Sequence, residues 1–395
     1  MPPLPPIDRI VLARYRQFHH CDIDLREPST GSPLREVCVL GPNGTGKSTL
    51  LRVLHQLSSG GSLEDELDAG FVAARHVTEE APLYHVQTQG ESIWCSAGIE
   101  ANPAFGRSLG ETVALSEFLS ACEEHRTEAP GWPVVRSAFF TPETTQVDGE
   151  PCAGLEELLR QLLQERSMAY REFLRRPENR DRTVAEADEA FRETRRTVAD
   201  SLTVAWDKVL SVARLRFDSD NRESLVSLDS GEAVPCSALS RGLRDFLLRL
   251  GLVFREYFDS DKQAGIVSLD DPEQGLHPSL CLGLIDLYRS ILDSHDTRLF
   301  VATHSPLIAT QFPATSRVVL GFGENGHIVA RPGTAPEGSD PERLLRQDFG
   351  VQLTDWQRRV RRAGEVTKLK RAIRQTEDQS ELADLLDEVM SLRRR

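Results

Sequence analysis

The stretch REVCVLGPNGTGKSTLLRVLHQLS, residues 35–58, decides which fold the chain is expected to adopt. It opens with an apolar run, Arg35–Gly41, that is typical of a short buried strand. It closes with a segment, Lys47–Ser58, in which leucines recur at helical spacing and form one apolar face. Because strands and helices alternate toward both ends of the chain, the pattern predicts an α/β fold with a largely parallel sheet.

The loop between this strand and this helix, GPNGTGKST (Gly41–Thr49), fits the pattern G-x-x-x-x-G-K-[ST] of phosphate-binding loops. Glycines let the backbone N–H groups converge on a phosphate, and the start of the following helix adds positive potential. An ordinary glycine-rich turn is the alternative. In a phosphate loop Lys47 reaches the β- and γ-phosphates, and the Ser48 hydroxyl binds Mg²⁺. The sequence therefore predicts ATP and Mg²⁺ as ligands, held here by Asn43, Gly44, Gly46, Lys47, Ser48 and Thr49.

A second segment, GIVSLDDPEQGLHPSL (Gly265–Leu280), is an apolar strand that ends in two adjacent carboxylates. A magnesium–nucleotide site needs an acid at the end of a strand. We expect Asp270 to hold Mg²⁺ through water, and Asp271 to point toward solvent and orient the attacking water. The alternative is a helix N-terminus, whose dipole favours acids such as Asp271 and Glu273 in any case.

Two further segments contain candidate site residues. VATHSPLIAT (residues 301–310) places His304 directly after an apolar strand that follows the acid-bearing strand by one helix. Such strands are neighbours in a parallel sheet, so we expect His304 near the γ-phosphate, as a catalytic residue beside Lys47 and Asp271. SALSRGLRDFLLRL (residues 237–250) places Ser240 and Gly242 at the start of a helix, where N–H groups are available to an anion. Taken alone, this start is an ordinary N-cap.

The remaining patterns divide the chain. Alternating residues predict an antiparallel hairpin near the N-terminus, with strands at residues 7–12 and 21–25. Two amphipathic helices, residues 155–176 and 183–210, are separated by PENRD and predict an inserted helical hairpin. Residues 278–292 are expected to form one helix. The predicted domains are an N-terminal lobe at 1–150, the helical insertion at 151–215, a C-terminal lobe at 216–335 and a charged helical tail at 336–395.

Composition excludes several classes of protein. The 395 residues carry a formal net charge of −14 and are 39% hydrophobic, which is typical of a globular protein and argues against one coated in nucleic acid. The 7 cysteines include no Cys-x-x-Cys pair, which indicates a reducing compartment. The chain shows neither a signal-peptide pattern nor an apolar run of the roughly 20 residues that a membrane helix needs. We therefore expect a cytoplasmic protein without a membrane partner.

The tail is locally basic. Its positive residues are Arg358, Arg359, Arg361, Arg362, Lys368, Lys370 and Arg371. Contact with DNA or RNA is one interpretation of this pattern. A solvated helix face and a partner-docking helix are the others.

As a set, these segments resemble the ABC-type ATPases of the SMC, RecF and OLD branch, and most of all the AAA-15/AAA-21 type found in antiphage systems such as Septu. LARYRQFHHCDIDL (residues 12–25) resembles the family's opening strand, and GPNGTGKST its Walker A motif. LSRGLRDFL (residues 239–247) resembles its signature, VSLDDPEQGLHP (residues 267–278) its Walker B motif and D-loop, and VATHSPLIAT its His switch. The chain departs from the family at Arg241, where glycine is common, at Leu243, where a polar residue is common, and at Asp271, where most relatives have glutamate.

The resemblance implies a head-to-tail homodimer, or a higher even oligomer, with ATP sandwiched between subunits. Lys47, Ser48, Asp270 and His304 of one subunit would face Ser240 and Gly242 of the other. Arg16 matches an arginine that lies near the phosphates in the family. Three glutamines are candidates for the Q-loop: Gln87, Gln89 and Gln146.

Three functions are compatible with these patterns. The first is an ATPase that gates a separate effector, expected to be a nuclease, in antiphage defence, because no Asp-x-Asp of a fused nuclease follows His304. The second is a RecF-like DNA-repair ATPase that binds DNA. The third is a protein that uses ATP only to join subunits. Asp271 is one methylene shorter than glutamate, so we expect slow hydrolysis.

Overall fold

The computed structural model describes most of the chain up to residue 351. The described residues are 5–63, 67, 70–78, 80–101, 115–130, 136–141, 145–147, 150–151, 154–194, 202, 206, 211, 215–217, 226–228, 232–257, 265–292, 297–336, 338–351 and 369. The chain divides into two compact units, Met1–Phe349 and Gly350–Arg395. The basic residues of the predicted tail lie outside the described residues.

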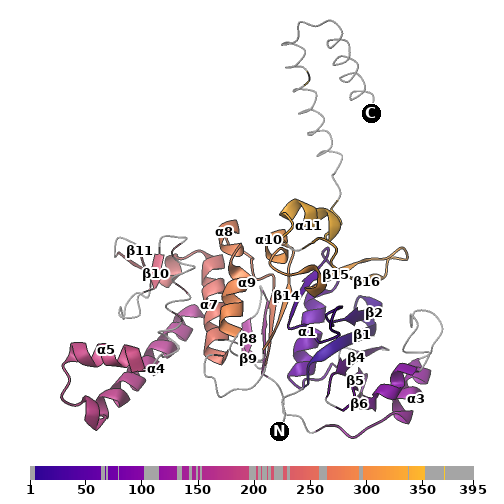
Figure 1. Ribbon diagram of the computed structural model, residues 1–395, viewed down its shortest axis with the longest axis horizontal. Coiled ribbons are helices and arrows are strands. Elements are labelled where there is room, and N and C mark those ends of the chain that lie inside the picture. The colour runs from indigo at the N-terminus through magenta and orange to yellow at the C-terminus, as the bar shows by residue number, and fades with distance from the viewer. Residues whose placement is uncertain are drawn as a thin grey trace, which may run out of the picture. The chain divides into compact units, whose positions relative to one another are not determined.

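The central sheet has eight strands in the order β16-β15-β3-β14-β13-β7-β8-β9 (Figure 1). Its five inner strands are parallel: β15 (Arg317–Phe322), β3 (Glu36–Leu40), β14 (Arg298–Ala302), β13 (Gly265–Asp270) and β7 (Arg136–Phe140). The edge strands are antiparallel: β16 (Ile328–Pro332), β8 (Thr145–Val147) and β9 (Glu150–Pro151). The carboxyl ends of β3, β13 and β14 meet at one edge, which brings the three motif loops together.

A second sheet is wholly antiparallel, in the order β2-β1-β4-β5-β6. Its strands are β1 (Ile7–Tyr15), β2 (Phe18–Asp24), β4 (Phe71–His76), β5 (Leu83–Thr88) and β6 (Glu91–Ser96). The predicted N-terminal hairpin is confirmed and is longer than its sequence pattern indicated. Next to this sheet lie the 3-10 turn η2 (Ala97–Ala101) and α3 (Leu115–Glu124). The Phe118 ring of α3 stacks on Phe71 at 3.9 Å.

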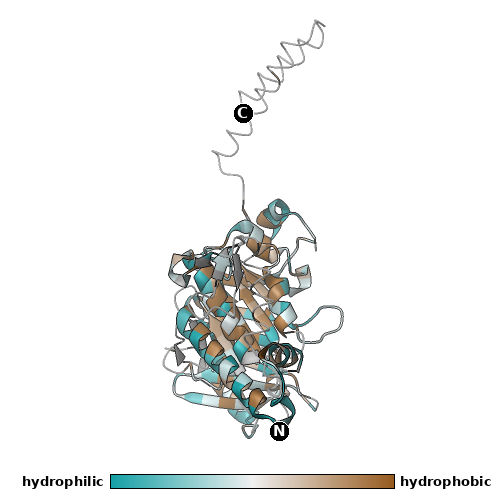
Figure 2. Cartoon of the chain, turned by 90° about the vertical axis from the view of Figure 1, so that its left-hand side faces the viewer, coloured by the Kyte–Doolittle hydropathy of each residue, from teal (hydrophilic) through white to brown (hydrophobic). Residues whose placement is uncertain are grey.

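Helices cover both faces of the central sheet (Figure 1), and apolar residues are concentrated in the middle of the body (Figure 2). α1 (Lys47–Ser58) packs between the two sheets, where Leu50 and Leu54 join Ile10 and Phe300 in one buried cluster. On the other face, α7 (Arg241–Tyr257), α9 (Leu284–Leu292) and the first half of α4 (Leu155–Arg175) share a second cluster. Shorter helices near the end of this unit are α10 (Pro306–Ala309), η6 (Ala314–Ser316) and α11 (Pro341–Gln347).

The prediction of one helix over residues 278–292 is wrong. The segment forms α8 (Pro278–Cys281) and α9, which are separated at Leu282 and Gly283. The Gln311 side chain stabilises the break, because its amide donates to the Cys281 carbonyl (2.7 Å) and its oxygen accepts from the Ile285 N–H (3.1 Å). One distant side chain thus satisfies backbone groups that a continuous helix would have paired internally.

The predicted helical hairpin is present as far as it is described. After α4 come η3 (Pro177–Asn179) and α5 (Val184–Thr194); the rest of the second predicted helix lies mostly outside the described residues. Phe173, Ala187 and Phe191 form a small core of its own at the far end of α4. A separate three-stranded antiparallel sheet follows: β10 (Leu215–Phe217), β11 (Val226–Leu228) and β12 (Ala233–Val234), with the short turn η5 (Cys236–Ala238) before α7.

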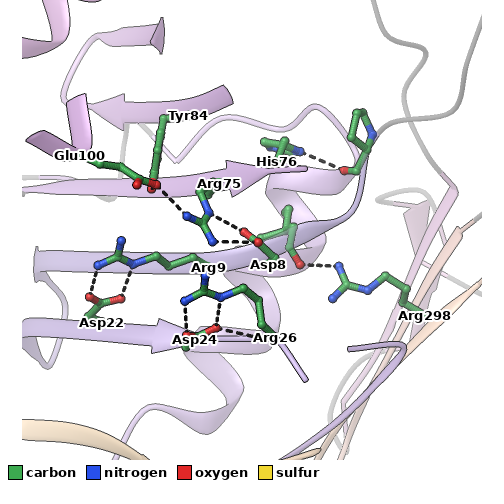
Figure 3. Close-up of polar contacts among 12 residues, drawn as sticks. Asp8, Arg9, Asp22, Asp24, Arg26, Arg75, His76, Tyr84, Glu100 and Arg298 are labelled. Carbon is green, nitrogen blue, oxygen red and sulfur yellow. Dashed lines mark hydrogen bonds and ion pairs between the residues drawn. The ribbon is translucent and has the colours of Figure 1, made fainter. Parts of the chain in front are cut away.

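Two arginines hold β1 in place through polar contacts (Figure 3). Arg75 on β4 donates to both oxygens of Asp8 on β1 (2.8 and 2.9 Å) and to Glu100 (2.7 Å). Arg298, at the start of β14, donates to the Ile7 carbonyl (2.7 Å). Arg75 thus ties β1 to β4 within the antiparallel sheet, and Arg298 ties β1 to the central sheet at the amino end of β14, opposite the edge that carries the phosphate loop.

Two buried histidines of the antiparallel sheet predict an acid-sensitive stability. Burial lowers the pKa of His76 and of His85 to about 4, well below the ordinary 6.5. The free energy of unfolding is therefore unaffected by these histidines above about pH 6.5. It falls as the pH drops toward 4, by up to about 3 kcal/mol for each histidine, because the unfolded chain binds the proton more readily. We expect His85→Phe, which keeps the stacking on Trp94 (4.4 Å), to flatten the fall in melting temperature between pH 6.5 and 4. A slope that is the same in the variant would contradict this assignment.

Candidate nucleotide site

The phosphate loop needs its glycines for steric reasons. Gly41, Gly44 and Gly46 have φ angles of 149°, 82° and 91°, a region that favours glycine. A Cβ at Gly46 would lie 2.4 Å from the Phe18 ring, and one at Gly41 would lie 2.3 Å from the Leu320 carbonyl oxygen. A Cβ at Gly44 would meet nothing within 4 Å. The loop is therefore packed tightly at both ends and open at Gly44, beside the exposed Asn43.

Lys47 is buried at the first position of α1. Its ammonium donates to the carbonyls of Gly41 (3.0 Å) and Pro42 (3.2 Å). Burial lowers the pKa of Lys47, and the carboxylates of Asp271, Asp270 and Glu273 oppose that shift. The first turn of α1 contains no acid, so the positive end of this helix reinforces the Lys47 charge. The arrangement suits a polyanionic ligand.

Ser48 and Asp270, which come from distant segments, meet beneath the loop. The Ser48 hydroxyl lies near the Asp270 carboxylate; burial raises the pKa of Asp270, and the neighbouring Ser48 hydroxyl opposes the shift. Mg²⁺ prefers oxygen ligands and is usually held by one or two carboxylates together with substrate phosphates and water. A hydroxyl and a carboxylate side by side next to the phosphate loop fit that donor set.

Asp271 has an unusual backbone. Its φ of 43° lies in the left-handed region, which only Arg14 and Arg16 share among the described non-glycine residues. Its N–H donates to the Ala302 carbonyl (2.9 Å), which ties it to the neighbouring strand β14. The expectation that Asp271 points to solvent is wrong for one oxygen, because Oδ1 is buried and lacks a hydrogen-bond partner among the described residues. Strained backbone and an unpaired carboxylate oxygen are concentrated at functional sites.

His304 follows β14 and is exposed. Partial burial lowers its pKa, the Lys47 charge lowers it further, and Asp271 opposes the shift. The imidazole therefore lies within electrostatic reach of both Lys47 and Asp271. The structure thus gathers Lys47, Ser48, Asp270, Asp271 and His304 at one sheet edge.

Ser240 and Gly242, the candidate signature residues, lie at the start of α7. The Ser240 hydroxyl caps α7 by accepting from the Leu243 N–H (3.3 Å), and the Ser240 residue is exposed. Gly242 packs against the turn after β13, so closely that a Cβ there would lie 2.2 Å from the Gly275 carbonyl oxygen. The sequence suggested an N-cap for Ser240, and the structure contains one.

The turn of the β1–β2 hairpin lies against the phosphate loop. Gln17, which the sequence reasoning missed, donates to the Thr49 hydroxyl (3.2 Å). Arg16 beside it is exposed, and its guanidinium lies 5.9 Å from the centre of the Tyr15 ring. Gln17 could have been identified from its place next to Arg16, in the stretch that resembles the family's opening strand.

The three candidate Q-loop glutamines occupy different places. Gln87 is buried and fastens the segment after α1: its oxygen accepts from the Leu63 N–H (2.9 Å) and its amide donates to the Gly61 carbonyl (3.2 Å). Gln89 is exposed at the end of β5. Gln146 lies on β8, which pairs with β7, the neighbour of the acid-bearing β13. The strand order therefore favours Gln146 over Gln87 as the Q-loop glutamine, which stays a prediction.

Comparison with known proteins supports an ATPase. Residues 153–309 match the family described as AAA ATPase domain. The match covers less than half of the chain; it includes the signature, Asp270, Asp271 and His304 but not the phosphate loop. A search of curated proteins finds no match. No helix among the described residues has the length and apolarity to cross a membrane.

Solved structures that are similar in outline are heads of SMC proteins. An SMC head bound to the C-winged helix domain of ScpA has a TM-score of 0.42 at 14% identity and covers 83% of this chain and 97% of that one. The SMC head domain from Thermotoga maritima has 0.41 at 12%, covering 84% and 100%. The Smc head with an extended coiled coil, bound to the C-terminal domain of ScpA derived from Pyrococcus furiosus, has 0.40 at 14%, covering 83% and 96%. These scores are too low to carry an argument, so the fold assignment rests on the sheet topology.

Proposed function

We propose that this chain is an ABC-type ATPase head that binds Mg²⁺ and ATP at the phosphate loop and hydrolyses the nucleotide slowly. The observation that supports the proposal most is the approach of the Asp270 carboxylate to Ser48 beside the buried Lys47. It joins a glycine-rich loop to an acid-ending strand, which are the two parts that P-loop ATPases need. The match of residues 153–309, which include Asp270 but not the phosphate loop, to an ATPase family supports the same conclusion.

Each residue has a role in this proposal. Lys47 would exchange the Gly41 and Pro42 carbonyls for phosphate oxygens, and Ser48 and Asp270 would hold Mg²⁺. Mg²⁺, when bound, neutralises charge on the β- and γ-phosphates. Asp271 would orient the attacking water and accept its proton. His304, whose lowered pKa favours the neutral imidazole, would donate one N–H to the γ-phosphate.

The proposal includes a nucleotide-dependent homodimer. Ser240 is exposed at the start of α7, where its cap leaves the helix end available to the nucleotide of a second chain. We expect a non-hydrolysable ATP analogue with Mg²⁺ to double the mass in solution from the 44.1 kDa of one chain, measured by light scattering after size exclusion. Ser240→Arg should bind the analogue normally and stay at the single-chain mass. Wild-type protein that binds the analogue but keeps its mass would overturn the dimer.

We further propose that the dimer gates a separate effector, expected to be a nuclease, in antiphage defence. The support is the resemblance of the motif set. The second candidate is a RecF-like repair ATPase, for which the support is the Asp270–Asp271 pair and the basic tail sequence. Phage plating on cells that carry the protein with its neighbouring genes tests the first function. Stimulation of ATP hydrolysis by gapped or duplex DNA tests the second.

A further inference from the structure

One side chain near the nucleotide site contacts both residues that flank His304. Glu273 lies in the turn after β13, two positions beyond Asp271. Its Oε1 accepts a hydrogen bond from the Thr303 hydroxyl and another from the Ser305 N–H (3.1 Å). The Ser305 N–H also donates to the Thr303 hydroxyl oxygen (2.9 Å), so the three groups form a closed set. His304 is the residue between the two donors.

The surroundings make this set rigid. Thr303 is fully buried directly after β14, and Ser305 is the N-cap residue of α10. The Glu273 turn is itself fixed, since the Gln274 N–H donates to the Asp271 carbonyl (3.0 Å) and the Leu276 N–H to the Glu273 carbonyl (3.0 Å). The carboxylate therefore connects the turn that begins with Asp271 to the loop that presents His304.

The Glu273 carboxylate is buried, and its second oxygen, Oε2, lacks a hydrogen-bond partner among the described residues. Burial raises the pKa of Glu273, and its bonds to Thr303 and Ser305 oppose that shift. A desolvated carboxylate is costly, and both of its side-chain bonds go to the His304 loop.

We propose that Glu273 is the positioning residue for His304. It holds the Thr303 hydroxyl and the Ser305 N–H on either side of that histidine so that the ring meets the γ-phosphate. The inference rests on the proposed ATPase function and deepens it. Glu273 touches neither nucleotide nor water in this proposal and acts through His304.

Kinetics of paired variants test the role. Glu273→Ala removes both acceptors, and we expect kcat to fall about 10²-fold, the cost of misplacing a reacting contact by about 1 Å. KM for ATP should change little, because the side-chain hydrogen bonds of Glu273 go to Thr303 and Ser305 and not to Lys47 or Ser48. Glu273→Gln keeps an oxygen that both donors can reach, so it should stay within about threefold of wild type, the effect of one weakened hydrogen bond. Thr303→Val should lose part of the activity and Thr303→Ser should keep it.

Two readouts separate positioning from a merely structural role. In the double variant Glu273→Ala/His304→Ala, kcat should fall no further than in His304→Ala alone, because residues that act as a unit are non-additive. In nucleotide-free protein, NMR titration should place the His304 pKa below 6.5 in wild type, where Lys47 and Asp271 are the charged groups that face it. In Glu273→Ala it should move back toward 6.5 as the loop loosens.

Three outcomes would overturn the inference: Glu273→Gln as inactive as Glu273→Ala, additive losses in the double variant, or an unchanged His304 titration in Glu273→Ala. The first would mean that the negative charge itself acts on water or metal. Failure of the proposed function is distinguishable, since wild-type protein without ATP hydrolysis would refute that function while the NMR titration still reports on Glu273.

Discussion

Lys47→Ala is expected to lower kcat for ATP hydrolysis by about 10²–10³-fold, the range for removing one preorganised donor to developing charge. The ammonium is buried, held at the loop by two carbonyls, and surrounded by Asp270, Asp271 and Glu273. Without it, three carboxylates lose their nearby cation, and repulsion of the phosphates adds to the lost contact. Phosphate release and calorimetric Mg·ATP binding measure the two effects.

A second variant and a control make this prediction specific. Lys47→Met keeps most of the aliphatic stem, so a loss equal to that of Lys47→Ala assigns the effect to the charge. Arg26→Ala removes a partly exposed cation that pairs with Asp24 at the end of β2 far from the β1–β2 turn, and it should change kcat by no more than about twofold. Lys47 variants that hydrolyse ATP at the wild-type rate would refute the nucleotide site itself.

Asp271→Asn is expected to lower kcat by about 10²–10⁴-fold, the usual contribution of a positioned base, while Mg·ATP binding is retained. The substitution is conformationally matched, because asparagine tolerates the left-handed backbone at φ 43° as well as aspartate does. Folding should therefore be preserved and the nucleotide-bound dimer should persist. Single-turnover hydrolysis and the lifetime of the dimer after ATP removal are the measurements.

Asp271→Glu tests the length of the side chain, because it adds one methylene and keeps the negative charge. We expect kcat to rise, since the carboxylate gains the methylene that most relatives have, and thermal stability to fall, since glutamate adopts the left-handed region less readily. Fast wild-type hydrolysis combined with an unaffected Asp271→Asn variant would contradict the role of Asp271. The base would then be His304 or Glu273.

The local parts of the site could be predicted from the sequence because each is encoded by neighbouring residues. The phosphate loop requires positive φ at its glycines, and glycines stand there. The helix after it has the predicted bounds, Lys47–Ser58, since its leucines recur at helical spacing. Asp270 and His304 were placed together correctly, because successive parallel strands end at one edge.

Other features could not be predicted, because they depend on side chains that meet across the fold. The break between α8 and α9 depends on Gln311, which is far from both helices in sequence. Gln87 was a Q-loop candidate, but both its amide oxygen and its amide nitrogen hydrogen-bond the segment after α1. Periodicity describes one element at a time and carries no information about such partners.

By itself, then, the sequence determined the α/β class, the phosphate loop and the acid-ending strand, because glycine conformations, helical spacing and strand-terminal acids are local properties. Only the tertiary structure decided that Asp271 takes a left-handed backbone with one buried oxygen, and that Glu273 reaches the residues on both sides of His304. These features arise where the ends of β13 and β14 meet, and strand order together with burial sets which groups face each other there.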